Sequence, residues 1–393
     1  MTDTEAYLKA EQLFINAFKI KPTIKEISYG RLELIGNHTD HQHGKCLVAT
    51  CSLGIRGYIL KDDGIVSIAS EGYETFSFSS NDLDLINEEI GSTIALTKGV
   101  LFALKKMGYK VGGFKASLVS DIFKGAGVSS SAAYEMFIAE AINYLYNDNS
   151  IPKIDMAKAG QYAENIYYNK ASGLLDQCGS ILGGIAYLDF KDLANPLVEP
   201  IEFPTDWDLS IILINPGASH EGLSDLYSEM PNDMKEVAKT IFNKDVLGEV
   251  SELEFVNALS NKDFSKVSER AKNRAIHYFN EIKRVDRAYL AIKEHNLDAF
   301  LSIIKEGELS QETLLKNVMI PNEYKGSTLE AVNRANLFLE KGASRVMGGG
   351  LVGTTINFVP FSEKDKFING MSQYYKDECI VEVSIPSLGA HIE

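Results

Sequence analysis

Cysteine is scarce in this chain of 393 residues, and long apolar runs are missing. The four cysteines, Cys46, Cys51, Cys178 and Cys379, form no Cys-x-x-Cys pair. Such usage is typical of reduced thiols in a reducing compartment. No stretch approaches the roughly 18 uninterrupted apolar residues of a membrane span, and residues 1–20 lack the basic start and apolar core of a signal peptide. We therefore expect a cytoplasmic protein.

Positive charge is also in short supply. Lysine and arginine number 39 against 54 aspartates and glutamates, so the formal net charge is −15. Duplex DNA or an anionic membrane would require a concentrated basic patch, and the sequence has none. We expect neither nucleic acid nor a membrane as a partner. Any phosphate that the protein binds must be held by local geometry rather than by overall charge.

Three common nucleotide-binding motifs are missing as well. The segment from Gly348 to Thr354 has the glycine spacing of a Walker motif but lacks its lysine. The His-Arg-Asp and Asp-Phe-Gly motifs of protein kinases are absent. No Gly-x-Gly-x-x-Gly follows the first expected strand, which removes support for a dinucleotide-binding fold.

What is present is a mixture of helix and strand patterns. Apolar residues at helical spacing predict an N-terminal amphipathic helix through Ala10, Leu13, Phe14, Ala17 and Phe18. Asp63-Gly64 predicts a β-hairpin. Further patterns predict helices over 92–107, 131–146, 156–168 and 327–341, strands over 114–119, 185–190, 209–214, 354–359 and 378–385, and a helix-rich region over 234–317. Prolines break the periodicity of residues 191–205, so we place a domain boundary there and expect domains 1–195 and 196–393.

A Gly- and Ser-rich segment, residues 124–133, lies between a predicted strand and a predicted helix. It reads Lys-Gly-Ala-Gly-Val-Ser-Ser-Ser-Ala-Ala. Glycines let the backbone approach a ligand closely and adopt positive φ. Serine hydroxyls stand beside the unpaired amides and the positive end of the helix dipole. These donors suit a polyphosphate, and the alternative is an ordinary Gly-rich turn with a Ser N-cap.

A second segment, residues 30–44, is dense in hydrogen-bonding side chains. It reads Gly-Arg-Leu-Glu-Leu-Ile-Gly-Asn-His-Thr-Asp-His-Gln-His-Gly. Donors and acceptors packed this closely suit a polyhydroxylated ligand. A solvated turn is one alternative, although it explains less well why Arg31 lies in an otherwise apolar strand. Another alternative is a metal site formed by His38, Asp40, His41 and His43.

These two segments together resemble the galactokinase branch of the GHMP small-molecule kinases. The sugar signature of that family, Gly-Arg-x-x-x-x-Gly-Glu-His-Thr-Asp-Tyr, is similar to residues 30–41, and its nucleotide loop is similar to residues 125–133. Three more matches follow in family order: Gly173–Gln177 with Glu164 twelve residues before Asp176, then Asn215, His220 and Tyr227, and finally the Gly-rich residues 345–353.

The resemblance implies an α+β, two-domain GHMP kinase fold with the active site in the interdomain cleft. It also implies an ATP-dependent sugar 1-kinase, a galactokinase first of all, that uses Mg²⁺ and exists as a monomer or weak homodimer. By position, Asp176 would orient or deprotonate the anomeric hydroxyl, and Arg31 would stabilise the transferring phosphoryl group. Ser130 and Glu164 occupy the Mg²⁺ positions of the family.

The remaining site residues that the resemblance implies fall into two groups. Those for the sugar are Asn37, His38, Asp40, Gly173 and Tyr227, with simple packing as the alternative for Tyr227. Those for the nucleotide are Gly125, Ala126, Gly127, Val128, Ser129, Ser130, Ser131 and Ala132.

Asn37 departs from the family, which has a glutamate there that reaches toward the hydroxyl on sugar carbon six. Asparagine carries no charge and can donate. It therefore removes the repulsion between a glutamate and the carboxylate of a uronic acid. That repulsion costs about 4 kcal/mol at a separation of about 4 Å and an effective dielectric constant of about 20. Galacturonate or another hexose stays open as the substrate, and we expect Asn37→Glu to improve or preserve galactose use and to damage uronate use.

Two further alternatives concern the class of function. A non-catalytic sensor of sugar and ATP would keep the fold and lose the chemistry, yet Arg31, Asp176 and the serine run 129–131 are all intact. A GHMP kinase for mevalonate or homoserine is disfavoured by the polar loop, because those substrates lack the hydroxyls to occupy it.

Overall fold

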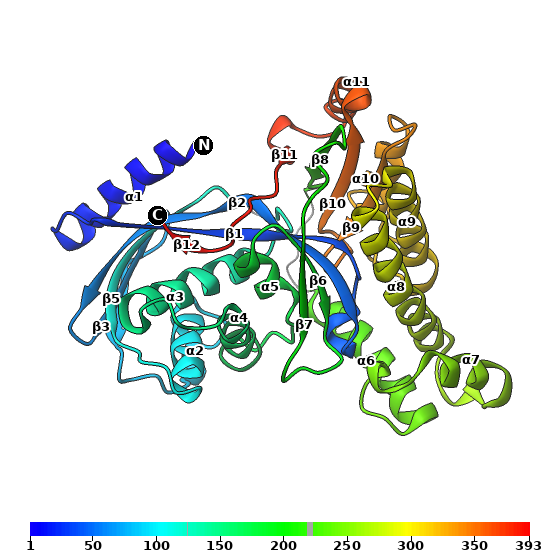
Figure 1. Cartoon of the computed structure of the whole chain (residues 1–393), viewed down its shortest axis with the longest axis horizontal. Coiled ribbons are helices and arrows are strands. Elements are labelled where there is room, and N and C mark those ends of the chain that lie inside the picture. Colours follow the sequence, from blue (N-terminus) through cyan, green and yellow to red (C-terminus); the bar gives the residue numbers. More distant parts are fainter. Residues whose placement is uncertain (124, 218–222) are drawn as a thin grey trace.

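The computed structural model describes residues 1–123, 125–217 and 223–393. Two residues that the sequence analysis assigned to motifs, Lys124 and His220, lie outside this part of the chain. The described residues form two β-sheets with helices packed against them (Figure 1). This confirms the α+β class.

The first sheet has eight strands and is built mainly from the N-terminal half. Its strands are β1 (Ile24–Ile35), β2 (Lys45–Asp62), β3 (Ile65–Ser70), β4 (Phe76–Ser79), β5 (Gly113–Ser120), β6 (Ile185–Asp189), β7 (Leu197–Ile201) and β12 (His391–Ile392). The main order is β12-β1-β2-β5-β3-β4, and β6 pairs with β2 and β7. Strands β1 and β2 are long, antiparallel and mostly buried, as expected for strands covered on both faces.

Helices cover both faces of this sheet (Figure 1). They are α1 (Asp3–Phe18), α2 (Thr93–Lys106), α3 (Ser130–Asn147), α4 (Lys153–Tyr162), which continues as a π-helical turn (Ala163–Tyr167), and α5 (Leu175–Leu182). Helix α1 packs on β2 and β5, whereas α3 and α5 pack on β1 from the other side. A capping box between Thr2 and Glu5 starts α1, and Ala10 and Phe14 are buried, so the predicted N-terminal helix is confirmed.

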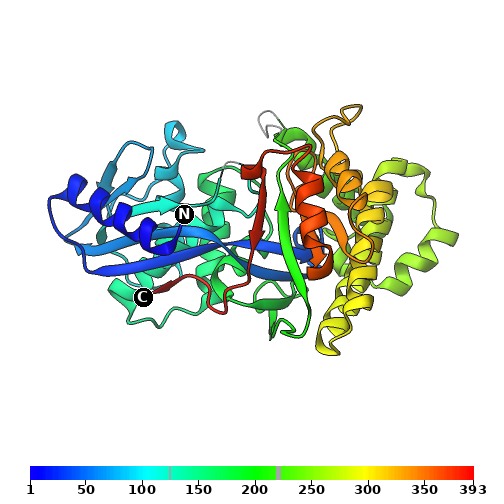
Figure 2. The ribbon, with the colours of Figure 1, turned by 90° about the horizontal axis from the view of Figure 1, so that it is seen from above.

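The second sheet has four strands in the order β11-β8-β10-β9. They are β8 (Leu209–Ile214), β9 (Ala343–Met347), β10 (Thr354–Pro360) and β11 (Ile380–Val383). The helices of this half are α6 (Ser224–Phe242), α7 (Glu252–Asn261), α8 (Glu269–Lys293), α9 (Leu297–Ser310), α10 (Thr328–Asn336) and α11 (Lys364–Met371). Figure 2 shows α8 and α9 beside this sheet, and α8 also contacts β1 and β2.

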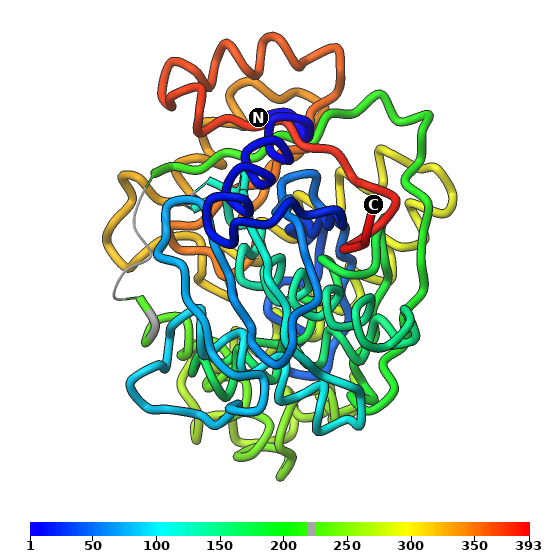
Figure 3. The backbone as a smooth tube through the Cα atoms, turned by 90° about the vertical axis from the view of Figure 1, so that its left-hand side faces the viewer, coloured from blue at the N-terminus to red at the C-terminus, as the bar shows by residue number. Residues whose placement is uncertain are grey.

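The two halves share both a core and a sheet. One apolar cluster contains Leu34 and Leu47 from the first sheet together with Leu213 and Ile356 from the second. Strands β7 and β12, which follow residue 195, belong to the first sheet, and Figure 3 shows the C-terminal end lying close to the N-terminal segments. The division into domains 1–195 and 196–393 stays a prediction.

One strand connection differs from the prediction. Asp63-Gly64 does turn the chain, and Gly64 has φ +82°, but the flanking strands β2 and β3 do not pair. Strand β5 lies between them, antiparallel to β2 and parallel to β3. The predicted hairpin between β2 and β3 is therefore wrong, because both strands pair with β5, which comes later in the chain.

The described helices include none that is both long enough and apolar enough to cross a membrane. The four cysteines are free thiols, and three of them are buried.

Candidate active site

Three predicted residues from three different elements meet at one carboxylate. Arg31 of β1 donates from Nε to Asp176 Oδ1 at 2.7 Å, and Asp176 lies in the first turn of α5. The hydroxyl of Ser129, just before α3, donates to Asp176 Oδ2 at 2.8 Å. Arg31 also donates to the carbonyl oxygen of Gly127 at 2.6 Å. The predicted catalytic pair and the Gly/Ser-rich loop thus form one cluster.

The Gly/Ser-rich residues 125–133, called the phosphate loop from here on, have a backbone that requires glycines. Gly125 and Gly127 have φ of +82° and +69°, a region that side chains with a Cβ rarely adopt. The amide of Arg31 donates to Val128 O at 2.8 Å, and the hydroxyl of Thr354 in β10 donates to Gly125 O at 2.7 Å. The loop is therefore fixed by strands from both sheets.

Ser129 does not act as an ordinary helix cap. It has φ +60°, and its side chain makes no capping hydrogen bond to the backbone of α3. Its hydroxyl is bonded to Asp176 instead. A helix start without a side-chain cap can bind an anion with its N-terminal amides. The Ser N-cap of the alternative interpretation is therefore not formed by Ser129.

The charges around Asp176 keep this carboxylate ionised. Burial by itself raises its pKa, but Arg31, Lys170 and the hydrogen bond from Ser129 outweigh burial and bring the pKa below its usual value. An ionised carboxylate with a low pKa is a weak base and a good hydrogen-bond acceptor. The group is suited to orient a hydroxyl.

A second carboxylate, Glu164, lies beside the same loop. It is fully buried at the π-helical turn after α4, and its Oε1 accepts from Ser131 Oγ at 2.8 Å and from Lys170 Nζ at 2.6 Å. Gln177 donates to its Oε2 at 3.2 Å. Ser130, which we expected to act with Glu164, is exposed at the start of α3, and the hydroxyl bonded to Glu164 belongs to Ser131.

Lys170 is a residue that the sequence analysis missed. Its side chain is 52% exposed, yet its ammonium reaches the buried Glu164. Its charge also lowers the pKa of Asp176. The available signal was a basic residue six positions after Glu164 and six before Asp176, in a segment that otherwise carried no charge beside those two carboxylates.

In the described part of the chain, no three histidine, cysteine, aspartate or glutamate side chains are grouped to hold a metal ion. The proposed metal site of the 30–44 loop gains no support, because the rings of His38 and His41 are hydrogen bonded to each other at 3.2 Å. Mg²⁺ needs only one or two protein oxygens beside phosphates and waters. Glu164 and Ser131 offer two such oxygens side by side. The carboxylate oxygen of Glu164 already binds one cation, the ammonium of Lys170, so it can bind a metal ion in the same place.

Asp40 belongs to the polar loop of residues 36–44, called the sugar loop from here on. It lies against Gly173, which precedes α5. A Cβ at Gly173 would overlap the Asp40 carboxylate, so only glycine fits there. The amide of Leu175 lies 3.4 Å from Asp40 Oδ2. Burial and the nearby Asp176 raise the pKa of Asp40 to about 6. Asp40 and Gly173 are far apart in the sequence, and the resemblance assigned both to the sugar. The structure brings them into contact.

The other three predicted sugar residues meet at the Gly-rich turn that follows β9. Asn37 donates to Gly348 O at 2.6 Å, and His38 Nε2 lies 3.4 Å from Gly349 O. The hydroxyl of Tyr227 in α6 donates to Gly350 O at 3.2 Å, and its ring covers Gly349. The Gly-rich motif therefore contacts the sugar loop directly, and Arg31 Nη2 lies 3.4 Å from the position that a Cβ on Gly348 would take.

The structure changes the interpretation of Asn37. The residue is fully buried, and its amide donates to both oxygens of Glu33, at 2.9 and 3.0 Å, as well as to Gly348. Asn317 donates to its Oδ1 at 2.8 Å. Both amide hydrogens are committed within the protein and a carboxylate lies behind them, so Asn37 is not placed as a free donor for a uronate.

Glu33 is itself held by Arg345, a fully buried residue of β9. Arg345 Nη2 donates to Glu33 Oε1 at 2.7 Å, and its Nη1 donates to the carbonyl oxygens of Glu33 and Leu34. Burial raises the pKa of Glu33 although Arg345 and Arg31 oppose this. Sequence reasoning missed Glu33, whose signal was a charged residue two positions after Arg31 in the apolar part of this strand.

Helix α8 supports the start of the sugar loop with buried polar groups that the sequence analysis also missed. Glu281 accepts from the amides of Gly36 and Asn37 at 3.0 and 3.1 Å, and His277 contacts Asn37 O at 3.1 Å. Arg284 and other positive groups lower the pKa of Glu281 to about 2 against the effect of burial. The signal was polar residues at i, i+4 and i+7 on one helix face.

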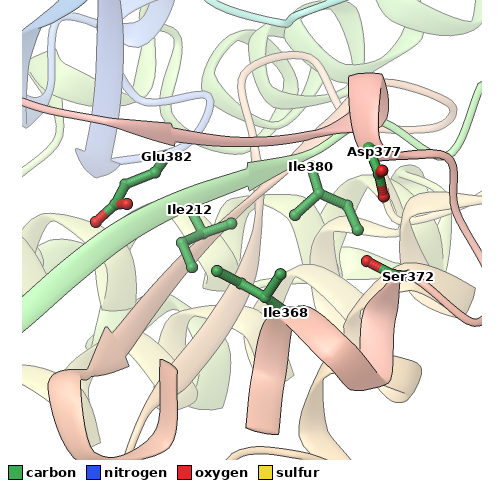
Figure 4. A pocket seen from close by; sticks show the side chains of 6 residues that line it. All are labelled: Ile212, Ile368, Ser372, Asp377, Ile380 and Glu382. Carbon is green, nitrogen blue, oxygen red and sulfur yellow. The ribbon is translucent and has the colours of Figure 1, made fainter. Parts of the chain in front are cut away.

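Two cavities of the structure lie away from these residues. One of about 180 Å³ is lined by Ile212, Ile368, Ser372, Asp377, Ile380 and Glu382 (Figure 4). The other lies between α6 and α7, next to Phe242 and Lys262. Neither contains a residue of the site described above.

Comparison with known proteins points to one family. The model of the GHMP kinases N-terminal domain matches residues 95–184, and the galactokinase galactose-binding signature matches residues 12–59. The chain is 30% identical over 388 residues to a galactokinase of Clostridium perfringens, covering 96% of each protein. It is 30% identical over 351 residues to a galactokinase of Pyrococcus furiosus, covering 88% of this chain and 90% of that protein.

A solved structure confirms the fold. The crystal structure of Lactococcus lactis galactokinase complexed with galactose superposes with a TM-score of 0.83 at 24% identity, covering 98% of this chain and 99% of that one. The Clostridium perfringens relative covers the whole length over which the motifs are spread. This chain belongs to the galactokinase family of the GHMP kinases.

Proposed function

We propose that this protein is a galactokinase that transfers the γ-phosphoryl group of ATP to the anomeric hydroxyl of galactose. The observation that carries the proposal is the contact among Arg31, Asp176 and Ser129. It brings a cation, an ionised carboxylate and the serine just before α3 together through hydrogen bonds to that carboxylate. Membership of the galactokinase family supports the choice of substrate.

In this proposal Asp176 accepts a hydrogen bond from the anomeric hydroxyl and orients it for attack on the γ-phosphorus. The new O–P bond replaces the bond between the γ-phosphorus and ADP, and ADP leaves. The hydroxyl proton passes late to Asp176, because phosphoryl transfer is loose and the nucleophile needs little activation. A carboxylate with a lowered pKa is adequate for that role. Arg31 stabilises the negative charge that develops on the transferring group, and the amides at the start of α3 bind the phosphates.

Glu164 and Ser131 would hold Mg²⁺, with Ser131 in place of the expected Ser130. The ion, when bound, neutralises charge on the phosphate oxygens. Lys170 bonds to the same Glu164 oxygen that the ion would take, so the two cations would compete for it. Nothing in this arrangement requires a third acidic ligand.

The contacts of Asn37 favour galactose over galacturonate. A carboxylate on sugar carbon six would approach a position where the Glu33 carboxylate is already buried 2.9 Å from the Asn37 amide. Arg345 is committed to Glu33 and to two carbonyl oxygens. A neutral hydroxyl meets no such penalty. The cleft between the domains, the cytoplasmic location and the monomer or weak homodimer stay predictions.

The decisive experiment is a panel of free hexoses and uronates assayed for Mg-ATP-dependent release of ADP, with the position of the phosphate determined by NMR. We expect galactose 1-phosphate as the main product and little turnover of galacturonate. Tight binding of galactose without ADP release would instead favour the non-catalytic sensor. Phosphorylation of galacturonate at a rate equal to that of galactose would contradict the assignment of Glu33.

A further inference from the structure

A directed chain of hydrogen bonds crosses the sugar loop, and the reaction proposed above does not use it. The chain begins at the amide of Leu247, passes through the side chains of Gln42 and His41 to His38, and ends at the carbonyl oxygen of Gly349. It therefore joins the segment after α6 to the Gly-rich turn through the sugar loop.

The first bond fixes the direction of the whole chain. The amide of Leu247 donates to Gln42 Oε1 at 3.1 Å, so the oxygen end of this side chain faces Leu247. The Nε2 end then lies 3.1 Å from His41 Nδ1. A primary amide nitrogen only donates, so His41 Nδ1 must accept. A neutral imidazole that accepts at Nδ1 carries its proton on Nε2.

The same reasoning passes to the second ring. His41 Nε2, which carries the proton, lies 3.2 Å from His38 Nδ1. His38 Nδ1 must therefore accept, and the proton of His38 is on Nε2. That N–H points to Gly349 O at 3.4 Å, the longest bond between the two rings and their partners. It is the bond most easily exchanged for another acceptor.

Both rings are neutral in this arrangement. Burial lowers the pKa of His38 to about 4, with His277 and Arg274 acting in the same direction. Burial, together with His38 and Lys235, lowers the pKa of His41 well below its usual value. A second proton on either ring would place two N–H groups against each other. The geometry and the surrounding charges thus agree.

We propose that Gln42 and His41 are positioning residues that hold His38 as its neutral Nε2–H tautomer, so that His38 offers an N–H donor to an oxygen of the bound sugar. The sugar oxygen replaces Gly349 O as the acceptor. This inference rests on the proposed function for the identity of the sugar. It makes Gln42, which need not touch the substrate, a determinant of sugar affinity.

The first test is the tautomer itself, in the full-length protein labelled with ¹⁵N-histidine. Long-range ¹H–¹⁵N spectra distinguish a protonated from an unprotonated ring nitrogen, and the signals are assigned by single substitution among the seven histidines. We expect His38 and His41 to carry their protons on Nε2 at neutral pH. A proton on His38 Nδ1, or a cationic His38, would overturn the proposal without any variant.

The second test reverses the direction of the chain with Gln42→Glu, which is nearly isosteric. A carboxylate only accepts, so His41 must donate from Nδ1 and His38 must then donate from its own Nδ1. We expect the His38 signals to change accordingly, and the Kd and KM for galactose to rise about tenfold, the usual cost of one lost hydrogen bond. The KM for ATP should change little.

His43→Asn is the matched control, because His43 is on the same loop and its left-handed backbone, with φ +59°, tolerates asparagine. It should leave the His38 tautomer and the galactose KM unchanged. An unchanged tautomer in Gln42→Glu, or a changed tautomer with unchanged galactose affinity, would refute the positioning role. Failure of the parent protein to phosphorylate galactose would refute the proposed function, while the tautomer spectra would still decide the positioning role.

Discussion

The two ends of the site handle charge in opposite ways. At the phosphate end, Asp176 and Glu164 form salt bridges with Arg31 and Lys170. The two cations can also attract a triphosphate, and the carboxylates can also attract a metal ion. At the sugar end, the groups that face the Gly-rich turn are an amide, a neutral imidazole and a phenol. The carboxylate behind this amide, Glu33, is paired with Arg345.

Under the proposed function, this difference explains how an acidic protein can bind an anion and a neutral sugar side by side. Ionic pairs at one end can be exchanged when the phosphates arrive, so their charges remain useful. Hydrogen bonds at the sugar end are already formed without substrate. They fix which groups donate and which accept, and this pattern favours hydroxyl groups, which can do both. We therefore expect substitutions at the phosphate end to change turnover and those at the sugar end to change folding or galactose affinity.

The largest effect is expected from Asp176→Asn. The change removes the charge and keeps the shape, so galactose and ATP should bind nearly as before, while kcat falls on the order of 10²–10⁴-fold. Steady-state kinetics and calorimetric binding check this. Asp286→Asn is the control, because Asp286 is also an ion-paired carboxylate, 2.8 Å from Lys45, outside the site. A near-normal kcat in Asp176→Asn would remove this residue from its role.

Asn37→Glu is expected to damage folding more than chemistry, which revises the expectation from the sequence. The new carboxylate would lie next to Glu33, and two like charges about 4 Å apart at an effective dielectric of about 20 cost about 4 kcal/mol. Denaturant unfolding should show a loss of that order. Adding Glu33→Gln should recover most of it, because Arg345 then pairs with one carboxylate. Full stability of the single variant would contradict the assigned network.

Lys170→Met tests whether the ammonium takes the place of a metal on Glu164. Without Mg²⁺ the variant leaves a buried carboxylate short of a partner, so its free energy of unfolding should fall by about 1–2 kcal/mol. Mg²⁺ with a non-hydrolysable ATP analogue should stabilise the variant more than the parent, as measured by thermal unfolding. Lys158→Met, which removes a lysine bonded to Ala194 O, is the control. Equal stabilisation of both proteins would exclude competition between Lys170 and the metal.

The smallest effect is a pH dependence from Asp40. Its pKa is raised to about 6, so the carboxyl takes up a proton as the pH falls through that value and the galactose KM should rise. In Asp40→Asn the galactose KM should be high and independent of pH, with the KM for ATP unchanged. The raised pKa also means that ionising Asp40 destabilises the folded state as the pH rises from about 4 to about 6. The parent should lose stability across this interval relative to Asp40→Asn, and parallel stability profiles would contradict the raised pKa.

The backbone of the Gly/Ser-rich loop could be predicted from the sequence because its determinants are local. Glycines at 125 and 127 and the serines before α3 specify a turn and a helix start within ten residues. Arg31 and Asp176 came from motifs. That Glu164 bonds to Ser131 rather than to Ser130 could not be predicted, since it depends on which side of the first turn of α3 faces Glu164.

The sugar end was less predictable because its partners are distant in sequence. Asn37 depends on Asn317 and on Gly348, and Glu281 holds the same loop from α8. No periodicity links such positions. The fold shows the same limit, because helices and strands were placed well while the insertion of β5 between β2 and β3 was not. Pairing between strands depends on long-range competition that local patterns do not record.

The pairing of β12 with β1 has a practical consequence for handling the protein. His391 and Ile392 cover the free edge of β1, opposite Ile27 and Glu26. Deleting these last residues would uncover a row of unpaired amides and carbonyls that a second molecule could join by strand addition. An affinity tag is therefore better fused at the exposed start of the first helix, and a C-terminal deletion is expected to aggregate.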